Sequence, residues 1–168
     1  MAIDVSSLSV EQALSMALKS EVESTNVYKK LKKMVENFVI KDKLQFLINE
    51  EKKHQKVIEE LIHRMFPGKE PEVPEKSLLP RVTLALKEEM SVPDLLELAM
   101  EAEKISEEFY DNLSEEVGER GVQEILQYLA SMEHSHYFLL KGEYDLCMRD
   151  EMYYKRGDFQ YDMVHIGP

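Results

Sequence analysis

The amino-acid sequence repeats itself at a spacing of 82 residues. Of the 46 residues from position 9 to position 54, 14 are identical to the residue 82 positions later, and the alignment contains no gap. A repeat of this length indicates one supersecondary unit that is used twice. The sequence therefore predicts a fold with two similar halves.

Each repeat unit carries apolar side chains in alternating steps of four and three residues, which is typical of a helix stripe that faces a partner. In the first unit, one stripe runs from Val10 to Phe38 and a second from Ile40 to Met65. The second unit repeats the stripes from Val92 to Val117 and from Val122 to Leu140. Four amphipathic helices of this kind predict an all-α four-helix bundle.

The glutamates in these stripes predict where the turns lie. If Glu21 and Glu51 lie at one height in an antiparallel helix hairpin, the turn is centred on position 36. For Glu103 and Glu133 the midpoint is position 118, a glycine within Val-Gly-Glu-Arg-Gly, which is a strong turn signal. The two carboxylates of each hairpin are therefore expected to face each other.

A proline-rich segment separates the two units. Five of the six prolines lie between positions 67 and 93. This segment is too long for a tight turn, but it could run the length of a helix of ~40 Å. We interpret positions 66–90 as a single long crossover, with a short helix from Leu78 to Met90. The expected organisation is one domain over 1–168, with repeat units at 9–65 and 91–147 and a C-terminal tail at 148–168.

Composition and charge exclude several classes of protein. The formal net charge is −12, with 33 acidic and 21 basic residues, so a partner such as nucleic acid or an anionic membrane is not expected. The only cysteine, Cys147, excludes a disulfide framework and a four-cysteine metal site. The sequence has neither a leader pattern nor a stretch of roughly 18 apolar residues. We therefore expect a cytoplasmic protein without a membrane span.

Glu-x-x-His motifs are the strongest chemical signal in the chain. The three motifs are Glu51-x-x-His54, Glu60-x-x-His63 and Glu133-x-x-His136. The first and third lie on the apolar stripes and occupy the same place in the two repeats. Glu60 lies nine residues after Glu51, roughly 180° around the helix, so the second motif is predicted to be a solvated surface pair.

Four stripe glutamates are expected to be buried, because solvating them would expose the apolar face of each helix. Four buried carboxylates at one height would repel each other, and each would lose several kcal/mol in desolvation, so a cationic group must lie among them. Two divalent ions balance four carboxylates, and two neutral imidazoles complete the ligands. A carboxylate-rich set of this kind favours two iron ions, or alternatively manganese, over a structural zinc. The predicted metal ligands are Glu21, Glu51, His54, Glu103, Glu133 and His136.

Two tyrosines follow the first glutamate of each unit along the same helix face. Tyr28 lies seven residues after Glu21, and Tyr110 lies seven residues after Glu103. Their hydroxyls are either the polar ends of ordinary core residues or hydrogen-bond donors to the carboxylates of the metal site.

From residue 9 to about residue 145, these motifs resemble the rubrerythrin-like branch of the ferritin-like di-iron superfamily. The matching motifs are Glu21-x6-Tyr28, Glu51-x-x-His54, Glu103-x6-Tyr110 and Glu133-x-x-His136. The resemblance implies a ferritin-like bundle with a non-haem di-iron centre that reacts with hydrogen peroxide or dioxygen. It also implies a peroxide reductase in oxidative-stress defence.

The sequence departs in three places from the patterns of the families that it resembles. Rubrerythrins end in a rubredoxin domain that delivers electrons, and this chain has neither the cysteines nor the length for one, so an external rubredoxin-like donor is expected. Their third helix carries an extra carboxylate three residues after the ligand glutamate, where this chain has Ser106, and Glu107 is a candidate for that role. Bacterioferritins bind haem through a methionine that follows the helix-two glutamate; Lys52 stands there, so no haem is expected.

The favoured hypothesis is a homodimeric di-iron oxidoreductase that reduces hydrogen peroxide or dioxygen, with the di-iron centre itself as the catalytic group. A first alternative is a ferroxidase that handles iron, which would require a hollow shell. A second is a di-iron hydroxylase, which would require an apolar or basic channel beside the metals. A third is a metal-binding bundle without catalytic activity.

Overall fold

The computed structural model describes residues 5–71, 73–75, 77–79, 82, 89–150 and 152–155. Within these residues all regular structure is helical, which confirms the all-α prediction. The α-helices are α1 (Val10–Met34), α2 (Phe38–Met65), α4 (Val92–Glu116) and α5 (Arg120–Arg149), and the 3₁₀-helices are η1 (Val5–Ser7) and η2 (Tyr153–Lys155).

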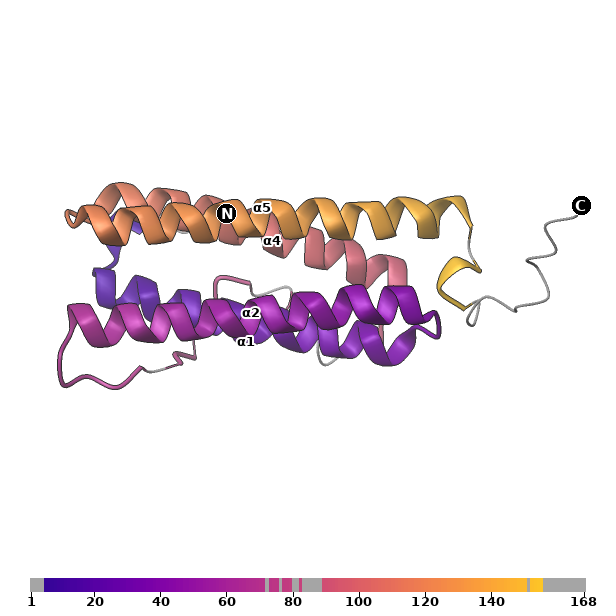
Figure 1. Ribbon diagram of the computed structural model, residues 1–168, viewed down its shortest axis with the longest axis horizontal. Helices are drawn as coiled ribbons and strands as arrows, with labels where there is room; N and C mark the ends of the chain where they lie inside the picture. The colour runs from indigo at the N-terminus through magenta and orange to yellow at the C-terminus, as the bar shows by residue number, and fades with distance from the viewer. Residues whose placement is uncertain are drawn as a thin grey trace, which may run out of the picture.

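The four long helices form a bundle of two antiparallel hairpins. Figure 1 shows α1 beside α2 and α4 beside α5, with all four helices along the long axis of the molecule. The hairpin loops are residues 35–37 and 117–119. This confirms the turns predicted at positions 36 and 118, and it brings the glutamates of each hairpin to one height.

Side-chain caps explain where three of the four long helices begin. Ser9 forms a capping box at the start of α1, and the Asn37 side chain accepts hydrogen bonds from two backbone N–H groups at the start of α2. Ser91 accepts a backbone hydrogen bond at the start of α4, whereas Glu119 makes no side-chain cap at the start of α5. The caps satisfy N–H groups that the first turn of a helix leaves without a partner.

The apolar stripes form the core of the bundle, with one exception. Leucines from all four helices are at most 2% exposed, and they include Leu14, Leu31, Leu47, Leu96, Leu113, Leu126 and Leu129. The sequence pattern predicts Phe38 on the stripe of the first helix, and this prediction is wrong. The chain leaves α1 after Met34, so Phe38 begins α2, where it is 46% exposed.

The described part of the crossover lies along α1. Lys19 of α1 donates a hydrogen bond to the backbone oxygen of Glu75, and Leu79 is buried in the core. Most of the short helix predicted from Leu78 to Met90 lies outside the described residues.

The described start of the C-terminal tail lies at the α1–α2 loop. The Glu36 N–H donates a hydrogen bond of 3.1 Å to the backbone oxygen of Tyr154. Most of the tail lies outside the described residues. No described helix combines the length and the low polarity that crossing a membrane requires.

We expect Asn37→Ala to lower the free energy of unfolding by about 1 kcal/mol, because the first turn of α2 loses its side-chain acceptor. Asn26→Ala is the matched control: it makes the same substitution at an exposed position inside α1, where alanine is the better helix former. Urea unfolding followed by circular dichroism measures both variants. Equal free energies of unfolding of the two variants would contradict a stabilising role of the Asn37 side chain as the N-cap of α2.

Candidate metal centre

The six residues predicted as metal ligands are all buried in the middle of the bundle. Each of the four glutamates is 1% exposed, and His54 and His136 are 2% and 1% exposed. One glutamate comes from α1, one from α4, and a Glu-x-x-His pair comes from each of α2 and α5. The helical period that places leucines in the core therefore places these six residues there as well.

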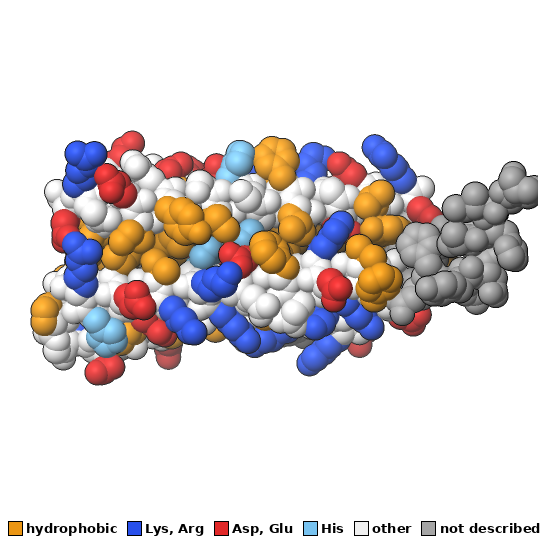
Figure 2. Space-filling model, viewed as in Figure 1, with side chains coloured by type: hydrophobic (Ala, Val, Ile, Leu, Met, Phe, Trp, Pro, Cys, Tyr) orange, Lys and Arg blue, Asp and Glu red, His pale blue; other side chains and the backbone are white. Residues whose placement is uncertain are grey.

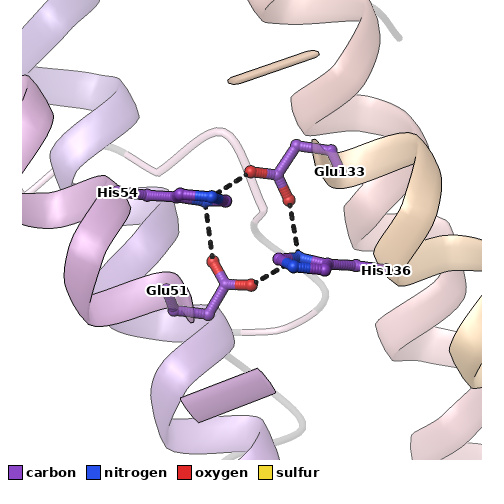
Figure 3. Close-up of side chains that lie close together, drawn as sticks. All are labelled: Glu51, His54, Glu133 and His136. Atoms are coloured by element: carbon purple, nitrogen blue, oxygen red, sulfur yellow. Dashed lines mark ion pairs between the residues drawn. The ribbon is translucent and has the colours of Figure 1, made fainter. Parts of the chain in front are cut away.

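The two Glu-x-x-His motifs face each other across the bundle. Figure 3 shows Glu51 and His54 on α2 pointing toward Glu133 and His136 on α5. His54 Nδ1 lies 2.9 Å from Glu133 Oε1, and His136 Nδ1 lies 2.9 Å from Glu51 Oε1. One potential ligand atom from each of these residues lies within 4.8 Å of the others. The four side chains are thus close enough to share a bound cation.

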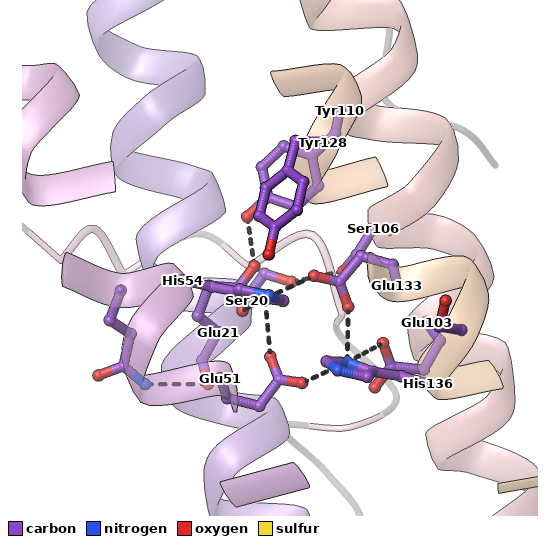
Figure 4. Close-up of polar contacts among 12 residues, drawn as sticks. Ser20, Glu21, Glu51, His54, Glu103, Ser106, Tyr110, Tyr128, Glu133 and His136 are labelled. Carbon is purple, nitrogen blue, oxygen red and sulfur yellow. Dashed lines mark hydrogen bonds and ion pairs between the residues drawn. The ribbon is translucent and has the colours of Figure 1, made fainter. Parts of the chain in front are cut away.

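The remaining two glutamates, Glu21 and Glu103, lie on opposite sides of this group, one beside each histidine. Glu21 Oε2 lies 3.3 Å from His54 Nδ1, and Glu103 Oε2 lies 3.7 Å from His136 Nδ1. The imidazole rings are stacked, with centroids 5.4 Å apart and an angle of 17° between their planes. Figure 4 shows all six side chains around one centre.

Without a metal, the charges in the cluster are balanced by protons. Burial and the repulsion of Glu133 raise the pKa of Glu51, and burial with the same repulsion raises the pKa of Glu103. Burial alone would lower the pKa of His54, but the interactions of His54 with the Glu133 and Glu21 carboxylates together outweigh burial and raise the pKa to about 11. Burial opposes ionisation of Glu133 too, but contacts with Glu103 and both histidines lower its pKa. A cation that binds here must displace the histidine protons.

A bound metal ion would satisfy the buried nitrogen and oxygen atoms of the cluster better than the protein alone does. Among the described residues, several of these buried atoms have no hydrogen-bond partner, and such atoms are costly to bury. His54 Nε2, His136 Nε2 and both carboxylate oxygens of Glu103 are among these atoms. Glu51 Oε1, Glu133 Oε1 and His136 Nδ1 also lack hydrogen-bond geometry, although they take part in the ion pairs described above. Carboxylate oxygens with imidazole nitrogens suit divalent transition metals. The cluster could therefore hold two such ions.

The two tyrosines differ in what they contact. Tyr110 is 1% exposed and donates a hydrogen bond to Glu21 Oε1 (Figure 4). Burial and the nearby Glu21 carboxylate raise the pKa of the Tyr110 phenol well above its usual value. Tyr28 is 0% exposed, but its hydroxyl has no hydrogen-bond partner among the described residues. The equivalent hydrogen bond, from Tyr28 to Glu103, is therefore not formed.

Three polar residues beside the cluster are not predictable from the sequence pattern. Gln55 Nε2 donates to the Glu21 backbone oxygen at 3.2 Å and to Thr25 Oγ1 at 2.9 Å. The hydroxyls of Ser20 and Ser106 lie 2.9 Å apart (Figure 4). The repeat carried no signal for Gln55, Thr25 or Ser20, because the residues 82 positions later are of different types.

The structure places Glu107 outside the cluster, although it was the candidate for an extra carboxylate. Glu107 Oε1 lies 2.9 Å from His134 Nδ1 at the surface, where their side chains are 30% and 56% exposed. The neighbouring Ser106 occupies the inward position, so Glu107 is turned toward solvent. Glu60 and His63 are also exposed, as predicted.

Two solved structures are similar to this chain in fold. The chain is 37% identical to a hypothetical protein from Pyrococcus furiosus, with a TM-score of 0.80 and coverage of 89% of this chain and 97% of that one. It is 19% identical to a dodecameric thioferritin, a bacterioferritin-related protein from Bacteroides fragilis, with a TM-score of 0.64 and coverage of 89% and 92%. The second likeness concerns the fold alone.

Comparison with curated proteins found no match. Comparison with protein families found the rubrerythrin family, whose model matches residues 12–144. The matched range contains all four long helices almost entirely and all six buried cluster residues. The chain therefore belongs to the rubrerythrin family.

Proposed function

We propose that this protein is a di-iron oxidoreductase that reduces hydrogen peroxide with electrons from an external donor. The observation that carries the proposal is the buried two-fold cluster of four glutamates and two histidines, in a chain of the rubrerythrin family. Bound iron would supply the two electrons of the reaction, in which H2O2, two protons and two electrons give two water molecules. Dioxygen is the other oxidant that such a centre could use.

In this proposal the protein supplies the ligands, the dry surroundings and the protons. The ligands are Glu21, Glu51, His54, Glu103, Glu133 and His136. Their burial excludes bulk water, which strengthens every electrostatic interaction at the site. The Tyr110 hydroxyl holds a proton at Glu21 Oε1, so it orients that carboxylate and keeps a proton within reach of the reaction.

Ferroxidase activity for iron storage is the second candidate function. It uses the same kind of centre, and the likeness in fold to the dodecameric thioferritin motivates it. Storage needs a hollow shell, so a native mass near that of twelve chains would favour it. The peroxide reductase is expected to be a homodimer, so the native mass measured by light scattering would distinguish the two functions.

The oxidation stoichiometry tests the favoured reaction. We expect the protein, loaded with iron and reduced without oxygen, to hold about two Fe²⁺ per chain and to oxidise both with one H2O2, because one peroxide accepts two electrons. Metal analysis and an anaerobic titration followed by absorbance give both numbers. Bound iron that keeps its oxidation state when peroxide is added would support a metal-binding bundle without catalytic activity.

Removing one glutamate from each Glu-x-x-His motif tests the ligand assignment. We expect Glu51→Ala with Glu133→Ala to reduce the metal content from about two ions per chain to less than one, since each glutamate is a proposed ligand. Glu60→Ala is the matched control, because Glu60 belongs to an exposed Glu-x-x-His motif, and it should leave the metal content unchanged. An unchanged metal content in the double variant would disprove the assignment of Glu51 and Glu133 as ligands.

The two tyrosines provide a test of the contact with Glu21. We expect Tyr110→Phe to destabilise the metal-free protein by about 1–3 kcal/mol, because Glu21 Oε1 loses its donor. It should also weaken iron binding by about tenfold or more. Tyr28→Phe, which removes a hydroxyl without a partner among the described residues, should leave both quantities nearly unchanged. Urea unfolding and chelator competition measure them, and identical behaviour of the two variants would refute the role of Tyr110.

A further inference from the structure

Positive charge is concentrated on the α1–α2 hairpin of this acidic chain. Nine lysines lie between positions 29 and 56, where only four acidic residues occur. The rest of the chain has 12 basic and 29 acidic residues. Figure 2 shows Lys and Arg side chains gathered along the lower helices, which are α1 and α2 in Figure 1. The net charge of −12 is therefore the sum of a positive segment, residues 29–56, and a negative remainder of the chain.

Five of these lysines line one surface hollow of about 470 Å³ between α1 and α2. We call them the lysine patch: Lys29, Lys32, Lys33, Lys41 and Lys52. The buried side chain of Ile48 also lines the hollow. The hollow is thus lined by five cationic side chains and one apolar side chain, together with Gln45.

The charges of the lysine patch are not neutralised within the described part of the chain. Lys43 and Lys53, which lie nearby on α2, form ion pairs with Glu143 and Glu50. No described acidic residue forms an ion pair with a patch lysine, and Lys32 instead donates a hydrogen bond of 2.6 Å to the neutral side chain of Gln45. Like charges around one hollow repel each other, so the stability of the fold does not account for the patch.

The lysine patch covers the outside of the helices whose inner faces carry the cluster. Lys52 directly follows Glu51, and Ile48 precedes Glu51 by three residues, roughly 4.5 Å along the helix axis. On α1, Lys29 directly follows the buried Tyr28. A partner bound at the patch would therefore contact the same two helices that carry Glu21, Glu51 and His54 of the cluster.

We propose that the lysine patch is the docking site of a small, acidic electron-transfer protein. This inference rests on the proposed function, which needs an external donor. Complementary charge accelerates and orients such encounters, whose interfaces are small. For each peroxide reduced, two donor molecules each lose one electron, and these two electrons replace the two that pass to H2O2. Nucleic acid is disfavoured as the occupant, because most of the remaining surface is acidic.

Charge reversal tests the docking site. The variant is Lys29→Glu with Lys33→Glu and Lys52→Glu, and a second variant carries Gln at the same positions in case the first does not fold. The probe is a reduced, acidic rubredoxin, and stopped-flow absorbance follows its oxidation by the iron-loaded, oxidised protein. We expect the second-order rate constant at about 0.02 M salt to fall roughly tenfold or more in the Glu variant. The difference should shrink at about 0.5 M salt, where charges are screened.

A matched control carries the same change in net charge at exposed positions on the other hairpin and the tail. It combines Lys104→Glu, Arg149→Glu and Lys155→Glu, and its rate constant should stay within about twofold of the wild type. Peroxide turnover with the small neutral reductant tetramethyl-p-phenylenediamine, which needs no docking site, should be the same in all variants.

The outcomes separate this inference from the proposed function. If rubredoxin reduces the patch variants as fast as the wild type while turnover with the small reductant persists, the docking site is wrong and the function stands. If the wild type turns over with neither donor, the function fails, and calorimetric titration with rubredoxin at low salt then decides the docking site. Patch-dependent binding of single-stranded DNA without binding of rubredoxin would overturn the inference in favour of a polyanion site.

Discussion

The burial of four carboxylates at one height sets the conditions for the rest of the bundle. Each glutamate is 1% exposed, so none of their mutual repulsion is relieved by water. In the metal-free molecule, burial and this repulsion raise the pKa of Glu51, and the surrounding carboxylates raise the pKa of both histidines against the effect of burial, so proton binding offsets the repulsion. Divalent cations can take over this role, and they can also bind buried atoms that make no hydrogen bond among the described residues.

The duplication supplies matching cluster residues in each half, but their surroundings differ. His54 lies near Glu21 and Glu133, and His136 lies near Glu103 and Glu51, as a two-fold arrangement requires. Tyr110 donates to Glu21, whereas the matching hydrogen bond to Glu103 is not formed. The two halves of the centre therefore differ in the hydrogen bonds that orient their carboxylates, and such differences tune the affinity and basicity of ligands.

The helical period gives α2 two faces with opposite electrostatic character. Glu51 points into the bundle, where it contributes negative charge to the cluster, while the adjacent Lys52 points outward into the lysine patch. The lysine side chains keep their charges in water, where they lose no solvation and remain available to a partner. One helix thus carries residues of both the buried cluster and the lysine patch.

Most of the fold and the core of the site are encoded locally in the sequence. The apolar period, the 82-residue repeat and the midpoint between paired glutamates predicted four helices, both hairpin loops and six buried side chains, because each depends only on helical geometry. The tertiary structure alone decided which faces of different helices meet. It turned Glu107 toward solvent, brought Gln55 to Glu21, and gathered lysines of α1 and α2 around one hollow. Spacing within one helix cannot determine such contacts, because they depend on how neighbouring helices are rotated against each other.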